Sequence, residues 1–134
     1  MPTKSPFFKK INLKRLIRAF VVTWFFIGGI CHFLLPELFV LIVPSYVPFK
    51  LLAVYISGFF ELIGALGLLM PLTRLNAGYG LIVLTILVTP ANIYMLQNAA
   101  LFPSVSVWAL IVRLPFQLVL IWLIWWSARD NRFV

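Results

Sequence analysis

Two side chains of opposite charge lie deep inside long apolar stretches of the sequence. Glu61 follows Lys50 by eleven residues, and Arg113 follows Pro103 by ten. With a helical rise of about 1.5 Å per residue, both lie roughly 15–16 Å from the same end of their helices. A charge in hydrocarbon costs at least ~2.5–3.5 kcal/mol, so each one needs a partner. We therefore expect Glu61 and Arg113 to form an ion pair between two helices.

Further polar side chains fall in the same half of the apolar stretches. Gln117 lies one helical turn after Arg113, so the two share a helix face. His32 and Asn92 are predicted to lie at a similar, outer level, near the ends of their helices. Together these residues predict a polar pocket that opens outward, and its six candidates are His32, Glu37, Glu61, Asn92, Arg113 and Gln117.

The types of these residues suggest how such a pocket would hold a ligand. Arg113 would supply a fixed cationic donor and Glu61 its paired carboxylate. His32 would exchange a proton, while Asn92 and Gln117 would orient the ligand by hydrogen bonds. An alternative stays open, in which the Glu61–Arg113 pair only fixes the register of two helices.

Small residues surround Glu61 on its predicted helix. Ser57, Gly58, Gly64 and Ala65 each lie three or four positions away from it. Small residues let helix backbones approach closely. We therefore expect this face to point into a helix bundle and not toward lipid.

Several other kinds of chemistry lack the residues that they need. Cys31 is the only cysteine, so no disulfide or dithiol can form within the chain, and we expect it to be an apolar filler. Because Cys31 and His32 are adjacent and point to different helix faces, we expect no metal site. No P-loop, dinucleotide fingerprint or nucleophile triad occurs, and no cofactor is evident.

The helices that position these residues are predicted to cross a membrane. Hydrophobic residues make up 63% of the 134 residues and charged residues 10%, against about 25% charged in soluble domains. Such a chain cannot build a polar shell, which excludes an ordinary soluble enzyme. A bilayer core of about 30 Å needs about 20 apolar residues per helix, and four such spans are predicted at residues 16–35, 50–70, 77–96 and 106–126. The predicted fold is all-α, an integral membrane antiparallel four-helix bundle.

The distribution of charge predicts the orientation of these spans. Six of the eleven basic residues lie in the first eighteen positions, and the net charge is +8. Arg74, Arg129 and Arg132 fall on the same side of the predicted bundle, whereas Lys50 falls on the other. The positive-inside rule then places both termini in the cytoplasm, with residues 1–15 as a basic segment and residues 127–134 as a tail. No folded basic surface remains, so we expect a lipid bilayer and no nucleic acid as partner.

Short motifs from the first predicted span to the last follow a recognisable order. They are His32-Phe33 with Pro36-Glu37, Ile42-Val43-Pro44 with Tyr46-Val47-Pro48, Ile56-Ser57-Gly58 with Glu61 and Gly64, Gly67-Leu68-Leu69 with Pro71 and Arg74, Pro90-Ala91-Asn92 with Met95, and Arg113-Leu114-Pro115 with Gln117. Their order and spacing resemble the DoxX-like family of small four-helix bacterial membrane proteins. The resemblance implies a multi-pass protein of the bacterial cytoplasmic (inner) membrane, linked in some members to a quinone-reducing or redox-associated complex. It also implies that the six polar candidates occupy recurring positions of the family.

Three functions follow as hypotheses from the sequence. The first is a membrane subunit, in a possible oxidoreductase complex, whose outward-facing pocket binds a small, partly apolar ligand such as a quinone headgroup. The second is a non-catalytic assembly or accessory protein that packs against a membrane or redox partner, or against copies of itself. The third is a small proton-coupled transporter, which the apolar inner half of the predicted bundle disfavours. In each case we expect that the chain is not an enzyme on its own.

Overall fold

The computed structural model describes residues 12–129, and every regular element in that part of the chain is helical. The predicted all-α class is therefore confirmed. Between residues 12 and 129 the elements are α1 (Leu13–Leu34), α2 (Pro36–Val40), α3 (Lys50–Leu69), α4 (Arg74–Leu87), α5 (Thr89–Gln97), the 3₁₀-helix η1 (Ala99–Leu101) and α6 (Val107–Ala128).

Four helical stretches in this part are long and apolar enough to cross a membrane. They are α1, α3, the segment Arg74–Gln97 that comprises α4 and α5, and α6. Helix α1 begins three residues before the predicted first span, and α6 ends two residues after the predicted last one. The predicted basic segment and C-terminal tail lie mostly outside the described residues, at 1–11 and 130–134.

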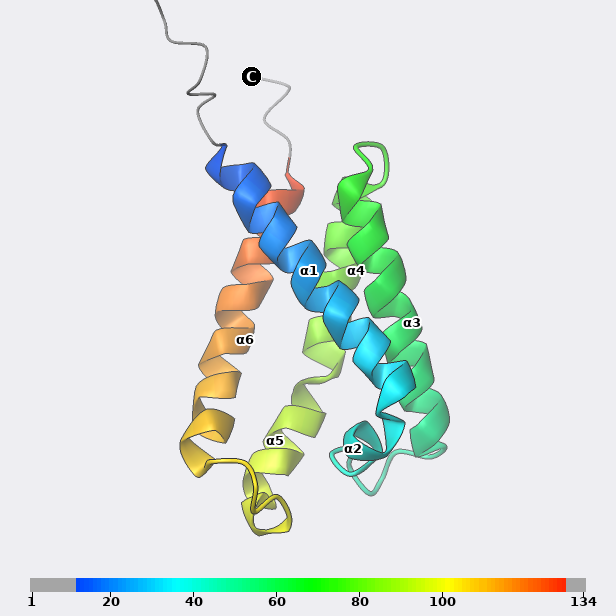
Figure 1. Ribbon diagram of the computed structural model, residues 1–134, viewed down its shortest axis with the longest axis vertical. Coiled ribbons are helices and arrows are strands. Elements are labelled where there is room, and N and C mark those ends of the chain that lie inside the picture. Colours follow the sequence, from blue (N-terminus) through cyan, green and yellow to red (C-terminus); the bar gives the residue numbers. More distant parts are fainter. Residues whose placement is uncertain (1–11, 130–134) are drawn as a thin grey trace, which may run out of the picture.

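The two ends of the molecule differ in character (Figure 1). The start of α1, the turn between α3 and α4, and the end of α6 lie together at one end. We call this the basic end, because Lys14, Arg15, Arg18, Arg74 and Arg129 belong to these segments. Helix α2, η1 and the longer connections lie at the opposite end, which we call the loop end.

Four pairs of long helices form the packing. Helix α1 packs against α3 and α6, and α4 packs against the same two helices. Consequently, α3 and α6 face each other across the space that α1 and α4 enclose (Figure 1). In the half nearer the basic end, this space is filled by a cluster of buried side chains: Val21, Phe25, Ala65, Leu68, Leu81, Leu120, Ile124 and Ala128.

The crossing of α1 and α3 depends on small residues, as predicted for the face around Glu61. Gly58 is buried there, and a Cβ at this position would lie 3.1 Å from the carbonyl oxygen of Gly29 on α1. Gly64 and Ala65, one to two turns further along α3, are also buried, but Gly64 packs against Leu81 of α4 and Ala65 belongs to the buried cluster. The absence of side-chain bulk brings the two backbones close together, and this contact directs Glu61 toward α1.

The third apolar stretch is broken into two helices, which differs from the continuous span predicted for residues 77–96. Helix α4 ends at Leu87 and α5 begins at Thr89, with Pro90 in its first turn. Proline has no backbone N–H and its ring crowds the preceding turn, so a helix kinks or stops there. The Thr89 hydroxyl donates a 3.1 Å hydrogen bond to the Thr85 carbonyl across the break.

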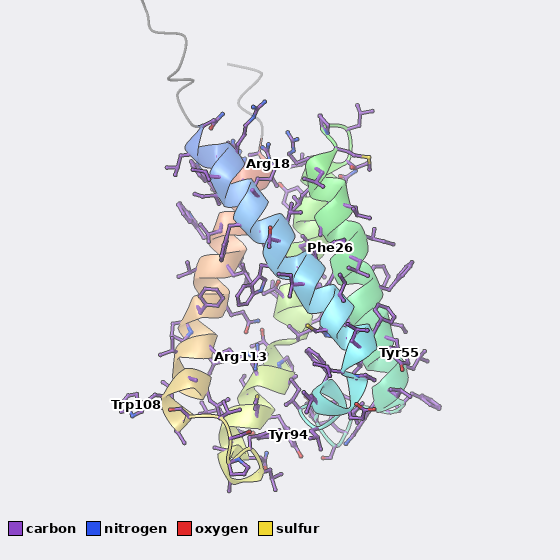
Figure 2. The ribbon with its side chains drawn as sticks, in the orientation of Figure 1. Arg18, Phe26, Tyr55, Tyr94, Trp108 and Arg113 are labelled. Atoms are coloured by element: carbon purple, nitrogen blue, oxygen red, sulfur yellow. The ribbon has the colours of Figure 1, made fainter. Side chains whose placement is uncertain are left out.

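Two arginines at the basic end bind backbone carbonyls near the ends of helices. The Arg18 side chain, near the start of α1 (Figure 2), donates to the Ser127 carbonyl of α6 at 2.9 and 3.1 Å. The Arg74 Nε donates to the Leu68 carbonyl of α3 at 2.9 Å. The last carbonyls of a helix lack intrahelical donors and carry partial negative charge, so cations stabilise them. These contacts tie α1 to α6 and α4 to α3 at the end opposite the candidate site.

Candidate functional site

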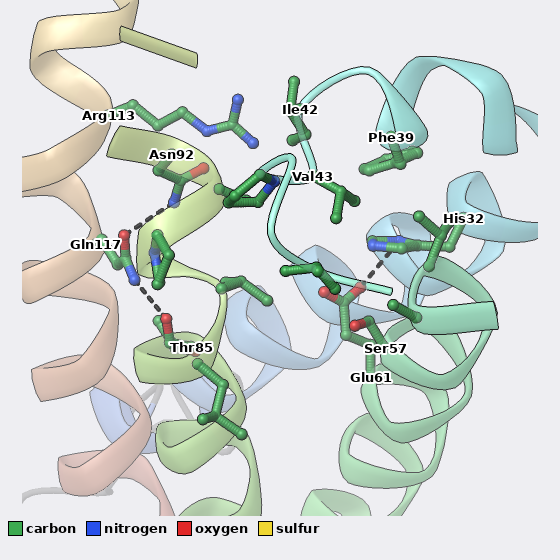
Figure 3. A pocket seen from close by; sticks show the side chains of 18 of the residues that line it. His32, Phe39, Ile42, Val43, Ser57, Glu61, Thr85, Asn92, Arg113 and Gln117 are labelled. Atoms are coloured by element: carbon green, nitrogen blue, oxygen red, sulfur yellow. Dashed lines mark hydrogen bonds and ion pairs between the residues drawn. The ribbon is translucent and has the colours of Figure 1, made fainter. Parts of the chain in front are cut away.

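A cavity of about 350 Å³ lies between the helices on the side of the core that faces the loop end. Residues of α1, α2, α3, α4, α5 and α6 all line it. Its volume falls within the range of about 300–1,000 Å³ that is typical of small-molecule sites. Most of the lining is apolar, and Figure 3 shows the polar side chains on two opposing sides. Apart from Tyr46, the polar lining residues are His32, Ser57, Glu61, Thr85, Asn92, Arg113 and Gln117.

One side, which we call the acid wall, is made by Glu61 of α3 and His32 of α1. The Oε2 atom of Glu61 lies 3.5 Å from Nδ1 of His32. The imidazole is buried and stacks on the ring of Phe39 of α2, with 3.9 Å between the ring centroids. Gly28 lies one turn before His32, and a Cβ there would come within 3.0 Å of Glu61 Oε2. The carboxyl group therefore fits against α1 because position 28 has no side chain.

Hydrogen bonding determines which nitrogen of His32 carries a proton. Nδ1 lies 2.7 Å from the carbonyl oxygen of Gly28. A carbonyl oxygen only accepts, so Nδ1 is the donor and Nε2 is the nitrogen that gains or loses a proton. Among residues 12–129, no donor satisfies the buried Oε2 of Glu61. The acid wall thus holds two neighbouring groups that can each bind or release a proton.

The opposite side, which we call the amide wall, is made by Asn92 of α5 and Gln117 of α6. Gln117 Nε2 donates to the Thr85 carbonyl and to the Thr89 hydroxyl. Asn92 Nδ2 donates to Gln117 Oε1 over 2.9 Å. The amide of Gln117 therefore bridges α4, α5 and α6 at the helix break, where regular backbone pairing is interrupted.

Arg113 does not pair with Glu61, so that prediction is wrong. Its Nη1 lies 3.3 Å from the sulfur of Met95 on α5, and within residues 12–129 the carboxylate of Glu61 has His32 as its ionic neighbour. Equal depth along two helices did not bring the charges together, because α3 and α6 lie on opposite sides of the enclosed space. Both residues nevertheless line the same cavity, and Figure 3 shows the guanidinium pointing into it from the α6 side.

Glu37 is the one candidate that does not line the cavity. It is exposed in the first turn of α2, a position where the helix dipole favours an acidic side chain. Its place in the sequence close to His32 suggested a shared site. However, the chain turns at Leu35 between α1 and α2, and Phe39 of α2 reaches the cavity instead.

Comparison with known proteins identifies the family of the chain. Residues 21–128 match a family described as a domain of unknown function, DUF8561. The chain belongs to this family. No curated protein and no solved structure matches the chain. All six predicted polar candidates and all residues that line the cavity lie inside the matched range.

Two threonines of the DUF8561 domain were missed as site residues. Thr85 lines the cavity, and the hydroxyl of Thr89 takes part in the amide wall. The signal for them was present in the sequence, because two threonines one turn apart, the second directly before Pro90, can donate hydrogen bonds to carbonyls that a broken helix leaves open. Ser57 was predicted only as a small packing residue, yet it also lines the cavity.

The rest of the cavity surface is apolar. The segment after α2 covers it at the loop end through Ile42, Val43 and Pro44. Between α1 and α6, the rings of Trp24 and Phe116 meet with 5.0 Å between centroids, and both line the cavity. No group of three potential metal ligands occurs within residues 12–129. The groups that could hold a ligand are therefore the acid wall, the amide wall and Arg113.

Proposed function

We propose that the chain is a multi-pass protein of the bacterial cytoplasmic membrane, folded as an antiparallel four-helix bundle with both termini in the cytoplasm. The four long apolar helices and their exposed apolar surfaces support insertion into lipid. The basic end supports the orientation, because basic residues favour the cytoplasmic side. Lys50 lies at the start of α3, at the loop end, which would face outward.

This orientation is tested by labelling single cysteines in intact cells. In a Cys31→Ala background, Ser104→Cys at the loop end should react with a membrane-impermeant maleimide. Leu72→Cys, in the exposed turn at the basic end, should react only after the cells are opened. The reverse pattern would overturn the orientation.

We propose further that the cavity binds a small, partly apolar ligand with a polar head, and that a quinone-type ring is the best candidate class. The observation that carries this proposal is the pair of polar walls facing each other across an apolar cavity of about 350 Å³. A quinone ring has an apolar body and oxygen atoms at its two opposite ends. Arg113 would bind one end, and the acid wall would face the other.

A buried apolar cluster closes the cavity toward the basic end, which favours ligand binding over proton-coupled transport. The buried cluster that includes Phe25, Leu68 and Leu120 fills the bundle between the cavity and the basic end. Transport of protons would require polar groups or water through this region. The proposed protein is thus a ligand-binding membrane subunit, and a redox-active membrane complex is the partner class that a quinone would imply.

Several of the motifs that resemble the DoxX-like family coincide with features of the cavity. Pro90-Ala91-Asn92 forms the helix break and contributes to the amide wall, and Arg113 with Gln117 comes from α6. We therefore propose a distant relation to that family. An experimental structure of a DoxX-like protein without a polar cavity at the corresponding helix break would argue against it.

The proposed function is tested by calorimetric titration of the protein in lipid nanodiscs with a short-chain quinone analogue. We expect saturable binding, and at least roughly tenfold weaker binding for Arg113→Ala, because hydrogen bonds to a charged group contribute about 1.5–3 kcal/mol. The matched control is Arg15→Ala, at the exposed basic end, which should bind like the wild type. Absence of saturable binding, or equal affinities for Arg113→Ala and wild type, would reject the proposal.

A further inference from the structure

The hydrogen bonds of the amide wall fix the direction in which each amide points. A backbone carbonyl has lone pairs and no hydrogen, so it can only accept. Because the carbonyl of Thr85 faces the Gln117 amide, the NH₂ group of Gln117 must lie on that side. The Oε1 atom of Gln117 must then lie on the other side, where Asn92 is. The orientation of Gln117 is thus set by the protein backbone.

The orientation of Gln117 in turn determines the orientation of the neighbouring Asn92. Gln117 Oε1 is an acceptor, so Asn92 must present its NH₂ group to it, and the distance from Nδ2 to Oε1 is 2.9 Å. The Oδ1 atom of Asn92 is left over, and no hydrogen bond within residues 12–129 uses it. Figure 3 shows this oxygen on the side of the side chain that faces the cavity and the Arg113 guanidinium. The amide wall therefore offers a ligand an acceptor and not a donor.

Arg113 adds donors next to this acceptor. Its Nη1 contacts Met95, which follows Asn92 by three residues and so lies about one turn along α5. The guanidinium has five N–H donors, and the thioether of Met95 is only a weak acceptor for one of them. A ligand atom between Asn92 Oδ1 and Arg113 would meet an acceptor on one side and donors on the other.

We propose that the cavity selects a ring that carries a free hydroxyl group, such as a quinol or phenol, over the same ring with a carbonyl or ether oxygen. A hydroxyl both donates and accepts, so it satisfies Asn92 Oδ1 and Arg113 together. A carbonyl or ether oxygen only accepts, and it leaves the asparagine oxygen desolvated without a donor, which is unfavourable. This inference rests on the proposed function and adds which form of the ring is bound.

The test compares ligands that differ only in this donor and do not change oxidation state. 1-Naphthol and 1-methoxynaphthalene are titrated against the protein in lipid nanodiscs, each with wild type and with Asn92→Leu. The wild type should bind the naphthol about three- to tenfold more tightly than Asn92→Leu does. For the methoxy compound, the affinities of the wild type and the variant should differ much less. For each compound, the affinity of the wild type is divided by that of the variant, which cancels the difference in lipid partitioning between the two compounds. Asn76→Leu, an exposed asparagine near the basic end, is the control and should keep the preference.

Gln117 should act as a positioning residue for this preference. Gln117→Leu removes the acceptor that holds Asn92 Nδ2, so the asparagine can turn its NH₂ group to the cavity. The ratio between the naphthol and methoxynaphthalene affinities that depends on Asn92 should then fall toward one. Gln117→Glu in its protonated form keeps an acceptor for Asn92 and a donor for Thr85, so the preference should return. A loss of affinity in both variants, with the naphthol preference unchanged, would show that Asn92 is not oriented in this way.

The outcomes separate this inference from the function on which it rests. If neither naphthalene compound nor the quinone analogue binds saturably, the proposed function fails. If ligands bind but the wild type and Asn92→Leu show the same ratio between naphthol and methoxynaphthalene, the inference fails and the proposed function stands. If the methoxy compound depends more strongly on Asn92 than the naphthol does, the amide presents its donor to the cavity and the inference is overturned.

Discussion

Gly58 of α3 packs directly against His32 of α1: a methyl group at position 58 would lie 2.6 Å from the Cβ atom of His32. The same glycine approaches the backbone of Gly29. Helices α1 and α3 can approach this closely, and so bring His32 beside Glu61, only because position 58 has no side chain. The geometry of the acid wall depends on this crossing.

The first prediction concerns this crossing. Gly58→Ala should lower the free energy of unfolding by about 1–3 kcal/mol, because α1 and α3 must move apart to accommodate the methyl group. The measurement is thermal or denaturant unfolding in detergent. Gly80→Ala is the matched control, since a Cβ built there meets no atom within 4 Å beyond the neighbouring backbone of its own helix, and it should keep or slightly raise stability because alanine favours the helix. Equal effects at the two positions would contradict the close crossing.

The second prediction separates a structural role of Glu61 from a role in binding. Glu61→Gln keeps the shape of the side chain, and Oε2 accepts no hydrogen bond from the described residues that the change could break. We therefore expect an unfolding midpoint within a few degrees of the wild type and an affinity for the quinone analogue that is several-fold weaker. A large loss of stability with unchanged affinity would mean that the carboxylate serves only to hold α1 and α3 together.

The third prediction concerns the basic end. Arg18→Gln should destabilise the protein by about 1–2 kcal/mol, because the Ser127 carbonyl near the end of α6 loses a charged donor. Arg15→Gln removes the same charge from an exposed neighbouring position and should have a much smaller effect. Unfolding of both variants in the same detergent provides the comparison. Similar losses for the two arginines would indicate a general charge effect and no specific cap.

The fourth prediction concerns the helix break beside the amide wall. Pro90→Ala restores a backbone N–H, so α4 and α5 should join into one more regular helix. Asn92 would then shift relative to Gln117, and ligand affinity should fall while thermal stability stays equal or rises. Titration and unfolding of the same preparation measure both. Unchanged affinity would show that the break is not needed to shape the cavity.

Much of the fold could be predicted from the sequence because the position and length of each apolar stretch determine where a long helix begins and ends. Helix α3 begins at Lys50, as predicted, and the other long helices begin or end within a few residues of the predicted spans. The small-residue face around Glu61 was also predictable, since close helix packing leaves a periodic pattern of glycine and alanine. The break at Val88 was not predicted, although Pro90 marked it, because proline is also tolerated inside membrane helices: α6 continues through Pro115.

The polar candidates were largely predictable, but their partners were not. Five of the six predicted residues line one cavity, because apolar helices tend to turn their polar side chains toward the space between the helices. Which of them meet depends on which helices are neighbours, and depth along a helix carries no information about that. Glu61 therefore lies beside His32 on the adjacent helix, and Arg113 lies beside Met95.

The proposal that a ligand lies between the acid wall and the amide wall can be examined by photolabelling. A quinone analogue with a small photoreactive group on its ring would be irradiated with the protein in lipid nanodiscs, and labelled residues would be mapped by mass spectrometry. We expect labels on both sides of the cavity, in the segments around His32 and Glu61 and around Asn92 and Arg113, and competition by unlabelled analogue. Labelling confined to exposed outer helix faces, with no effect of the competitor, would contradict a ligand site inside the bundle.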